Sequence, residues 1–162
     1  MRNWLLKLKR KAAPFRHLRG LGQWWLFAQV FLFAAVLPLL FRLKIPLVTR
    51  LLDVRIGREG AAAAAEEHDF IIRCVEWAML AGRPLVRPNC LTRGVTRYFF
   101  LRRAGVDLSL CFGAAWRQGE LIQAPGHCWL VKDGKPYLEM SDPLLCFVPI
   151  YSLPPASRSA DG

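Results

Sequence analysis

The sequence predicts an α+β fold, in which helices pack against a small antiparallel sheet behind a hydrophobic helical extension. Three observations lead to this fold class. Apolar residues recur at helical spacing through much of residues 61–104. From Val106 to Phe112 they alternate with polar residues instead, as in a half-buried strand. The pair Asp133-Gly134 is a strong turn signal between two further short strands, so the sheet is expected to contain a hairpin.

Charge and hydropathy divide the chain into an appendage and a domain. The net charge is +11, yet residues 1–52 hold ten of the 23 Lys and Arg residues and no acid, whereas the rest of the chain is nearly neutral. Such an asymmetry separates a basic extension from a globular domain. We therefore expect a basic and hydrophobic helical extension over 1–60, a domain over 61–150 and a flexible tail over 151–162.

The apolar run over residues 21–41 is about long enough to cross a bilayer, and three interpretations compete. A signal peptide is disfavoured because the run is too long and no cleavage site of small residues precedes Arg42. A membrane-spanning anchor is less favoured because Gln23, Gln29 and Pro38 interrupt the run and basic residues flank both sides. We expect a helix that lies on an anionic membrane surface or packs on the domain or on a partner protein.

Two helices are expected to follow this run. Residues 42–60 form a short helix that ends near Gly57 and Gly60. Residues 61–81 form a longer helix, which Gly82 ends.

Asn89 is a favourable N-cap for the next helix, which runs from Cys90 to about Ala104. Gly105 suits a left-handed C-terminal cap. The expected buried face comprises Leu91, Val95, Tyr98 and Phe99. Four arginines lie largely off that face: Arg93, Arg97, Arg102 and Arg103. Cys90 is thus expected in the first turn of a largely buried helix.

Three strands are expected after this helix. The first covers the alternating stretch at 106–112, and a polar loop lies at 117–120. The second covers His127–Lys132, and the third returns over Pro136–Met140 after the Asp133-Gly134 turn.

The cysteines indicate a reducing, cytoplasmic compartment rather than a disulfide framework. Their number is odd and their spacing scattered: Cys74, Cys90, Cys111, Cys128 and Cys146. No two form a C-x-x-C pair, and the possible ligands do not cluster at metal spacing, so we expect no metal site and no cofactor. Most of these cysteines are expected to act as small buried hydrophobic residues.

Cys90 and His127 are the candidate catalytic pair. The start of a helix favours a thiolate, and its free backbone N–H groups can bind an oxyanion. A thiol nucleophile also needs a base. His127 begins a strand, whereas His17 lies in the basic segment and His68 on the upstream helix. A lone cysteine at a helix start is by itself more often structural than catalytic, so this local chemistry leaves both roles open.

Four sequence segments, taken in their order along the chain, support the catalytic interpretation. They are Asn89–Gly94 (NCLTRG), Leu101–Val106 (LRRAGV), Gly126–Leu130 (GHCWL) and Asp133–Pro136 (DGKP). Together they resemble the transglutaminase-like domain of lasso-peptide maturation proteins of the microcin-processing type, over about residues 60–145. The resemblance implies a papain/transglutaminase-like cysteine hydrolase core, in which a helix carrying the cysteine packs on a small antiparallel sheet carrying the histidine and an acid.

The resemblance also implies a triad of Cys90 as nucleophile, His127 as general base and an acid on the returning strand, which is Glu139 here. The hairpin register bears on that acid. A two-residue loop would turn Glu139 away from His127 and place Asp142 on the histidine's face, whereas a three-residue loop would place Glu139 directly across from it. We expect Glu139, with Asp142 as the alternative.

Two departures from the family pattern flank the histidine. Cys128 follows it where a small residue is usual, and Val131 and Lys132 stand where the family has an acid. Neither is an expected triad position. We expect Cys128 to pack on the face opposite the histidine and Trp129 to shield the site from water.

The function that the resemblance implies is removal of the leader from a ribosomally made precursor peptide, before an ATP-dependent cyclase closes the lasso ring. The basic and apolar extension leaves no room for a leader-recognition domain, so a small recognition protein is an expected partner. The alternatives are other thioester acyl-transfer chemistry, such as cross-linking or deamidation, and a non-catalytic membrane-associated scaffold. Nucleic-acid binding is not expected, because a continuous aromatic run is a poor phosphate-binding surface.

Overall fold

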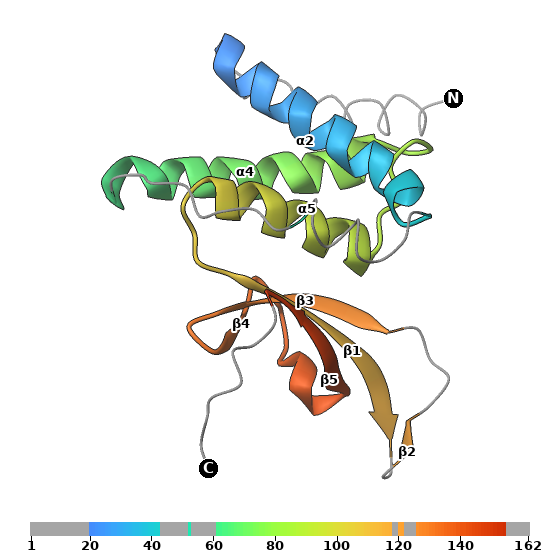
Figure 1. Ribbon diagram of the computed structural model, residues 1–162. Coiled ribbons are helices and arrows are strands. Elements are labelled where there is room, and N and C mark those ends of the chain that lie inside the picture. The colour runs from blue at the N-terminus through green and yellow to red at the C-terminus, as the bar shows by residue number, and fades with distance from the viewer. Residues whose placement is uncertain (1–19, 43–51, 53–60, 118–119, 122–125, 155–162) are drawn as a thin grey trace, which may run out of the picture.

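Two central helices separate a third helix from an antiparallel sheet, so the molecule has three layers (Figure 1). The computed structural model describes residues 20–42, 52, 61–117, 120–121 and 126–154. Within these residues the fold is α+β, as the sequence predicts. One hydrophobic core joins the three layers, because its buried residues come from all three helices and from the sheet.

Helix α4 (Ala61–Ala81) and helix α5 (Cys90–Arg103) form the middle layer (Figure 1). The expected bounds of α4 are confirmed, and α5 ends one residue earlier than expected. Gly105 then takes a φ of 88°, which a glycine adopts without steric cost. Arg102 was expected off the buried face, but it is buried, because its Nη1 donates a hydrogen bond to the Leu108 carbonyl at 2.7 Å.

The sheet has five strands in the described part of the chain, two more than expected. Its central strand β1 (Ser109–Arg117) pairs antiparallel with β3 (His127–Lys132) on one side and β5 (Phe147–Leu153) on the other. The short β2 (Glu120–Leu121) pairs with the end of β1, and β4 (Lys135–Tyr137) pairs with β3. The expected bounds of β3 are confirmed.

The observed strands differ from the expected ones in three places. β1 begins after the buried Val106 and Leu108, which lead into it from α5. β4 is shorter than expected because the chain leaves the strand at Leu138, where φ is 60°. β5 runs to Leu153 and so includes the first three residues of the stretch that we expected to be flexible, whereas residues 155–162 lie outside the described part.

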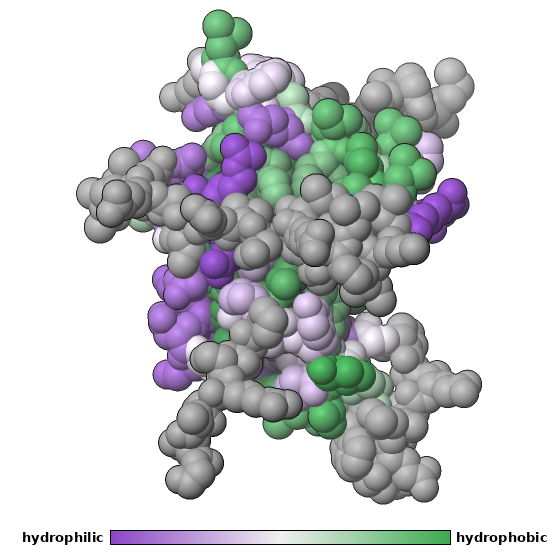
Figure 2. All heavy atoms as spheres, in the orientation of Figure 1, coloured by the Kyte–Doolittle hydropathy of each residue, from purple (hydrophilic) through white to green (hydrophobic). Residues whose placement is uncertain are grey.

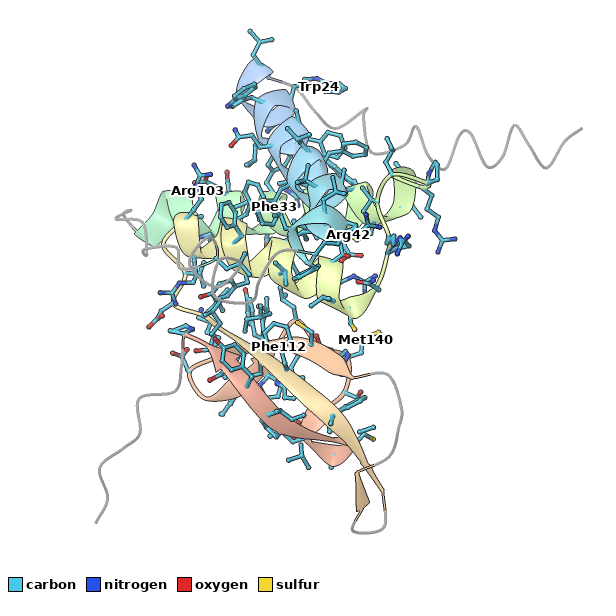
Figure 3. All side chains as sticks on the ribbon, turned by 45° about the vertical axis from the view of Figure 1, so that its right-hand side comes forward. Trp24, Phe33, Arg42, Arg103, Phe112 and Met140 are labelled. Atoms are coloured by element: carbon cyan, nitrogen blue, oxygen red, sulfur yellow. The ribbon has the colours of Figure 1, made fainter. Side chains whose placement is uncertain are left out.

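Helix α2 (Leu21–Leu40) lies across α4 and α5 on the side away from the sheet (Figures 1 and 3). Four residues of α2 itself, at helical spacing, are buried: Phe27, Val30, Ala34 and Leu37. Phe33 stacks on Phe99 with ring centroids 4.4 Å apart. α2 is also long and apolar enough to cross a membrane by length and composition. The short helix expected over 42–60 lies outside the described residues apart from Arg42 and Leu52.

Candidate active site

Cys90 is the first residue of α5, and the cap before it fixes its position. Asn89 has an extended backbone, and its side chain accepts a hydrogen bond from the Thr92 N–H at 2.7 Å. The first N–H groups of a helix have no carbonyl partner within it, so those of Cys90 and Leu91 are directed beyond the helix end. The thiol therefore lies at the start of a helix, where N–H groups can bind an oxyanion.

His127 is the first residue of β3, and two aromatic rings fix the plane of its imidazole. Trp129 stacks on the imidazole with ring centroids 5.9 Å apart, and Phe147 of β5 contacts it with centroids 5.1 Å apart. The Trp129 ring itself is buried over Gly113, the β1 partner of His127. A Cβ atom on Gly113 would lie 2.7 Å from that ring, so the glycine makes room for it.

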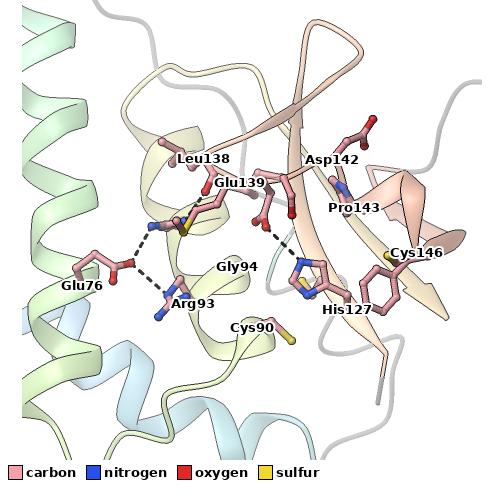
Figure 4. A pocket seen from close by; sticks show the side chains of 16 residues that line it. Glu76, Cys90, Arg93, Gly94, His127, Leu138, Glu139, Asp142, Pro143 and Cys146 are labelled. Atoms are coloured by element: carbon pink, nitrogen blue, oxygen red, sulfur yellow. Dashed lines mark hydrogen bonds and ion pairs between the residues drawn. The ribbon is translucent and has the colours of Figure 1, made fainter. Parts of the chain in front are cut away.

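The thiol of Cys90 meets the strand that carries His127. Its Sγ lies 3.9 Å from the carbonyl oxygen of Gly126, to which the S–H donates. Cys90 and His127 line one cavity of about 610 Å³. In Figure 4 the sulfur points from the end of α5 toward the side of the cavity on which the His127 ring lies. The structure thus brings the two predicted residues to the same cavity.

The hairpin between β3 and β4 has the register that we expected to turn Glu139 away from His127. The loop consists of Asp133-Gly134 alone, because Lys132 pairs with Lys135 and both loop residues have positive φ angles, of 50° and 73°. A regular strand in this register would direct Glu139 to the face of the sheet opposite His127.

Glu139 nevertheless contacts His127, because the strand ends before it. β4 ends at Tyr137, and Leu138 takes a φ of 60°, which few residues other than glycine adopt. Beyond it, Glu139 Oε2 lies 3.3 Å from His127 Nε2, an interaction drawn in Figure 4. Both side chains are about three-quarters buried, with 24% and 25% of their surface exposed. Our inference that only a three-residue loop would bring these two residues together was wrong.

Asp142, the alternative to Glu139, has a different partner. Its Oδ1 accepts a hydrogen bond from the Leu144 N–H at 2.9 Å and so caps the short 3-10 helix η2 (Pro143–Leu145). Figure 4 shows its carboxylate directed away from His127. The structure therefore brings Glu139, and not Asp142, to the imidazole.

Three charged residues of the same cavity were not assigned to the site from the sequence. Glu76 of α4 accepts from Arg97 Nη2 at 2.7 Å and pairs with Arg93 Nε at 3.2 Å. Arg97 was expected off the buried face, but only 12% of its side chain is exposed. Its Nη1 donates to the Leu138 carbonyl oxygen at 3.5 Å. The spacing of seven residues between Cys90 and Arg97, two helical turns, was the available signal that they share a face.

Charges around Arg97 act in opposite directions on its pKa. Burial lowers the pKa of the guanidinium, attraction to the Glu76 and Glu139 carboxylates raises it, and repulsion from Arg93 lowers it. Burial has the largest effect, so the net direction is downward. Arg97 nevertheless stays a cation, because an arginine is protonated throughout the accessible pH range.

All five cysteines are free thiols, and burial sets two of them apart from Cys90. Burial raises the pKa of the Cys74 thiol to about 12 and also raises that of Cys128. Both are therefore protonated at neutral pH. Cys128 packs against α5, where a Cβ atom on Gly94 would lie 2.9 Å from its sulfur, and it lines the same cavity as Cys90 and His127. Among the residues that the structure describes, no group of three or more His, Cys, Asp and Glu side chains could hold a metal ion.

Most of the chain matches a known protein family. The family described as Transglutaminase-like superfamily matches residues 35–152. The matched segment begins in the second half of α2 and includes α4, α5 and the strands around the cavity. No curated protein and no solved structure matches the chain.

Proposed function

This chain belongs to the transglutaminase-like superfamily, and we propose that it is a cysteine peptidase that removes the leader from a ribosomally made lasso-peptide precursor. One observation carries the proposed chemistry. A thiol at the start of a helix, an imidazole and a carboxylate in contact with that imidazole line a single cavity. These are the groups that nucleophilic attack on a carbonyl carbon requires.

In the proposed reaction each of these residues has its own step. When His127 Nε2–H donates to Glu139, the lone pair of Nδ1 is left to accept the Cys90 thiol proton. The thiolate attacks the carbonyl carbon of the scissile bond, and the first N–H groups of α5 stabilise the oxyanion. His127 then protonates the leaving amine, the C–N bond breaks, and a thioester to Cys90 remains. A water that gives its proton to His127 hydrolyses this thioester and restores the free thiol.

A precursor peptide as the substrate is supported by sequence likeness rather than by geometry. The segments that resemble lasso-peptide maturation proteins include those that carry Cys90 and His127. The proposed partners are the precursor, a small leader-recognition protein and a separate ATP-dependent cyclase that acts on the cleaved core. The proposed location is the cytoplasm, where free thiols stay reduced.

The test is cleavage of the precursor peptide, with the recognition protein present, by the wild type, Cys90→Ala and the matched control Cys111→Ala. Mass spectrometry follows the products. We expect two shorter peptides from the wild type and the control. For Cys90→Ala we expect the cleavage rate to fall by about a thousandfold or more. Equal cleavage by all three proteins would remove Cys90 as the nucleophile. A full-length product of altered mass would indicate deamidation or cross-linking instead of hydrolysis.

A further inference from the structure

We propose that Arg97 is a positioning residue, which holds the backbone of Leu138 so that the Glu139 carboxylate reaches His127. The inference rests on the proposed function for the reaction that it serves. The contacts that carry it lie among Glu76, Arg97, Leu138, Glu139 and His127, and they do not depend on what the substrate is.

The backbone at Leu138 needs an external support. A leucine at a φ of 60° has its Cβ atom close to the backbone, so the conformation persists only where the surroundings hold it. If Leu138 returned to an extended conformation, β4 would continue in its observed register. Glu139 would then turn to the face of the sheet opposite His127.

Arg97 is placed to give that support. Its Nη1 donates to the Leu138 carbonyl oxygen at 3.5 Å, while Nη2 is fixed by Glu76 Oε1 at 2.7 Å (Figure 4). With 12% of its surface exposed, the side chain has little room to move. A planar guanidinium can bind both groups at once, which an ammonium group does less well.

The same helix therefore locates both ends of the proposed triad. α5 presents Cys90 at its first residue and Arg97 two turns later on the same face. Glu76 connects this face to α4. The guanidinium also attracts the Glu139 carboxylate directly. A shift of α5 would move the nucleophile and the support of the carboxylate together.

The experiment compares Arg97→Met, Arg97→Lys and the matched control Arg103→Met, each in the wild-type and in the Glu139→Gln background. Arg103 is an exposed arginine of the same helix that lies over the Phe99 ring. Two readouts are taken. The first is kcat and KM for precursor cleavage. The second is the rate of Cys90 alkylation by iodoacetamide from about pH 6 to about pH 10, followed by peptide mass mapping.

We expect Arg97→Met to lower kcat about 10- to 100-fold with little change in KM and to change the pH profile of Cys90 alkylation. Arg97→Lys should keep an intermediate rate, and Arg103→Met should stay within about threefold of the wild type. In the Glu139→Gln background, Arg97→Met should lower kcat by less than about twofold, because the carboxylate through which Arg97 acts is gone.

An equal loss from Arg97→Met in both backgrounds would overturn the proposal, since Arg97 would then act on substrate binding or on folding. Thermal unfolding of each variant shows whether the loss of activity comes from a loss of folded protein. An unchanged rate and pH profile in a folded Arg97→Met protein would overturn it as well. The alkylation profile needs no substrate, so it separates a failure of this inference from a failure of the proposed peptidase activity.

An independent observation concerns α2, and from it we infer that this helix attaches the protein to the surface of an anionic bilayer. The residues Trp25, Leu32 and Leu39 recur every seven positions and are exposed by 69%, 65% and 59%. They form a stripe opposite the four residues that α2 buries in the core. Figure 2 shows hydrophobic side chains gathered toward the right-hand half of α2, with polar side chains to their left. A helix that is apolar on both faces needs a second apolar environment.

The packing of α2 favours the membrane surface over a span. Phe27 is 7% exposed and Val30, Ala34 and Leu37 are not exposed at all, so one face belongs to the protein core. A spanning helix would have to strip these contacts or draw the charged surface of α4 into the bilayer. A helix in the interface plane keeps the core and buries only its outer face in lipid.

The charges that flank α2 in the sequence indicate that the membrane surface is anionic. No residue of α2 is charged, and seven Lys and Arg residues precede it within the first 19 positions. Arg42, Lys44 and Arg50 follow it, and the first acid of the chain is Asp53. Cations on both sides of an apolar, tryptophan-containing helix complement a layer of anionic lipid headgroups.

The test is sedimentation of the full chain with vesicles of phosphatidylcholine alone or with about one quarter phosphatidylglycerol. The double variant Trp25→Glu/Leu32→Glu alters the outer face of α2, and Ile150→Glu on β5, where Ile150 is also 69% exposed, is the matched control. We expect the wild type and the control to bind the anionic vesicles about tenfold or more tightly than the neutral ones, and the double variant to lose this binding.

Three results would overturn this assignment. One is wild-type binding that is absent or that the double variant retains. The second is a dimer in solution that the double variant dissociates, which would make a second copy the occupant of the face. The third is resistance of the membrane-bound wild type to alkaline carbonate extraction, which would indicate a span.

Discussion

At the scale of the residue, the backbone of Leu138 decides which carboxylate contacts His127. A positive φ at a leucine costs of the order of 1–3 kcal/mol, so surrounding contacts must offset it. The result of that conformation is that Glu139 contacts the imidazole while Asp142 caps η2. Two acids three residues apart thus have different roles, which hydrogen-bond partners distinguish and residue type does not.

Replacing Glu139 by Gln is expected to lower kcat about 100-fold with a small effect on KM, because the amide cannot stabilise the imidazolium that forms during catalysis. Asp142→Asn is the matched control. An asparagine can still cap η2, so this variant should stay within about threefold of the wild type. Steady-state kinetics of precursor cleavage measure both. If Asp142→Asn lowered kcat more than Glu139→Gln did, Asp142 rather than Glu139 would be the acid that acts with His127.

The cysteines should differ sharply in their reactivity with iodoacetamide near pH 8. Burial raises the pKa of Cys74 to about 12 and also that of Cys128, so neither presents a thiolate at that pH. Cys90 and the exposed Cys146 should be labelled in the folded protein, and Cys74 and Cys128 only after unfolding. Peptide mass mapping with and without denaturant provides the measurement. Labelling of Cys74 as fast as Cys90 would contradict the buried position of Cys74.

At the scale of the element, close packing of α5 on β3 sets the geometry of the site. Gly94 lies one turn after Cys90, and a Cβ atom there would come within 2.9 Å of the Cys128 sulfur. The absence of a side chain at Gly94 and the small side chain at Cys128 let the helix approach the strand that carries His127. Cys128 therefore contributes to the site through its size rather than through its thiol chemistry.

Gly94→Ala is expected to lower the free energy of unfolding by about 1–3 kcal/mol and to lower kcat, because the added methyl group pushes α5 and Cys90 away from β3. Gly22→Ala on α2 is the matched control, since no atom lies within 4 Å of a Cβ at that position. It should raise the free energy of unfolding by about 0.5–1 kcal/mol without a change in kcat. Urea unfolding and cleavage kinetics measure both. Equal effects of the two substitutions would show that the contact with Cys128 does not limit the approach.

At the scale of the whole molecule, α2 is part of the core although the sequence marks it as an appendage. Its composition separates it from the domain, yet Leu37 is fully buried and Phe33 stacks on Phe99 of α5. The segment matched by the family begins at residue 35, within this helix. The boundary that we drew at residue 60 from charge therefore does not coincide with an interruption of the hydrophobic core.

Leu37→Ala is expected to lower the free energy of unfolding by about 2–5 kcal/mol, because the side chain is fully buried. The matched control is Leu32→Ala on the outer face of α2, where the side chain is 65% exposed, and a change within about 0.5 kcal/mol is expected. Denaturant unfolding of the full chain, followed by circular dichroism, measures both. If Leu37→Ala were as mild as its control, α2 would not be part of the cooperative unit.

By itself, the sequence determined the elements whose signals are local. The helix over Ala61–Ala81, the start of α5 at Cys90 after its Asn89 cap, and β3 follow from periodicity, capping and turn residues. It also identified Cys90, His127 and Glu139 as candidates, through segments that resemble a known family. The predictions of these helices and of β3 are confirmed because each depends on residues that are neighbours along the chain, whereas the catalytic roles of the three candidates stay predictions.

Only the tertiary structure decided the features that depend on residues far apart in the sequence. β5 contains Pro149 and has a weak local signal, and it forms because β1 provides a partner strand. The place of Glu139 beside His127 depends on a left-handed Leu138, whose carbonyl accepts a hydrogen bond from Arg97, 41 positions earlier. Periodicity cannot predict such a contact, because the energy that holds Leu138 in this conformation comes from another element of the fold.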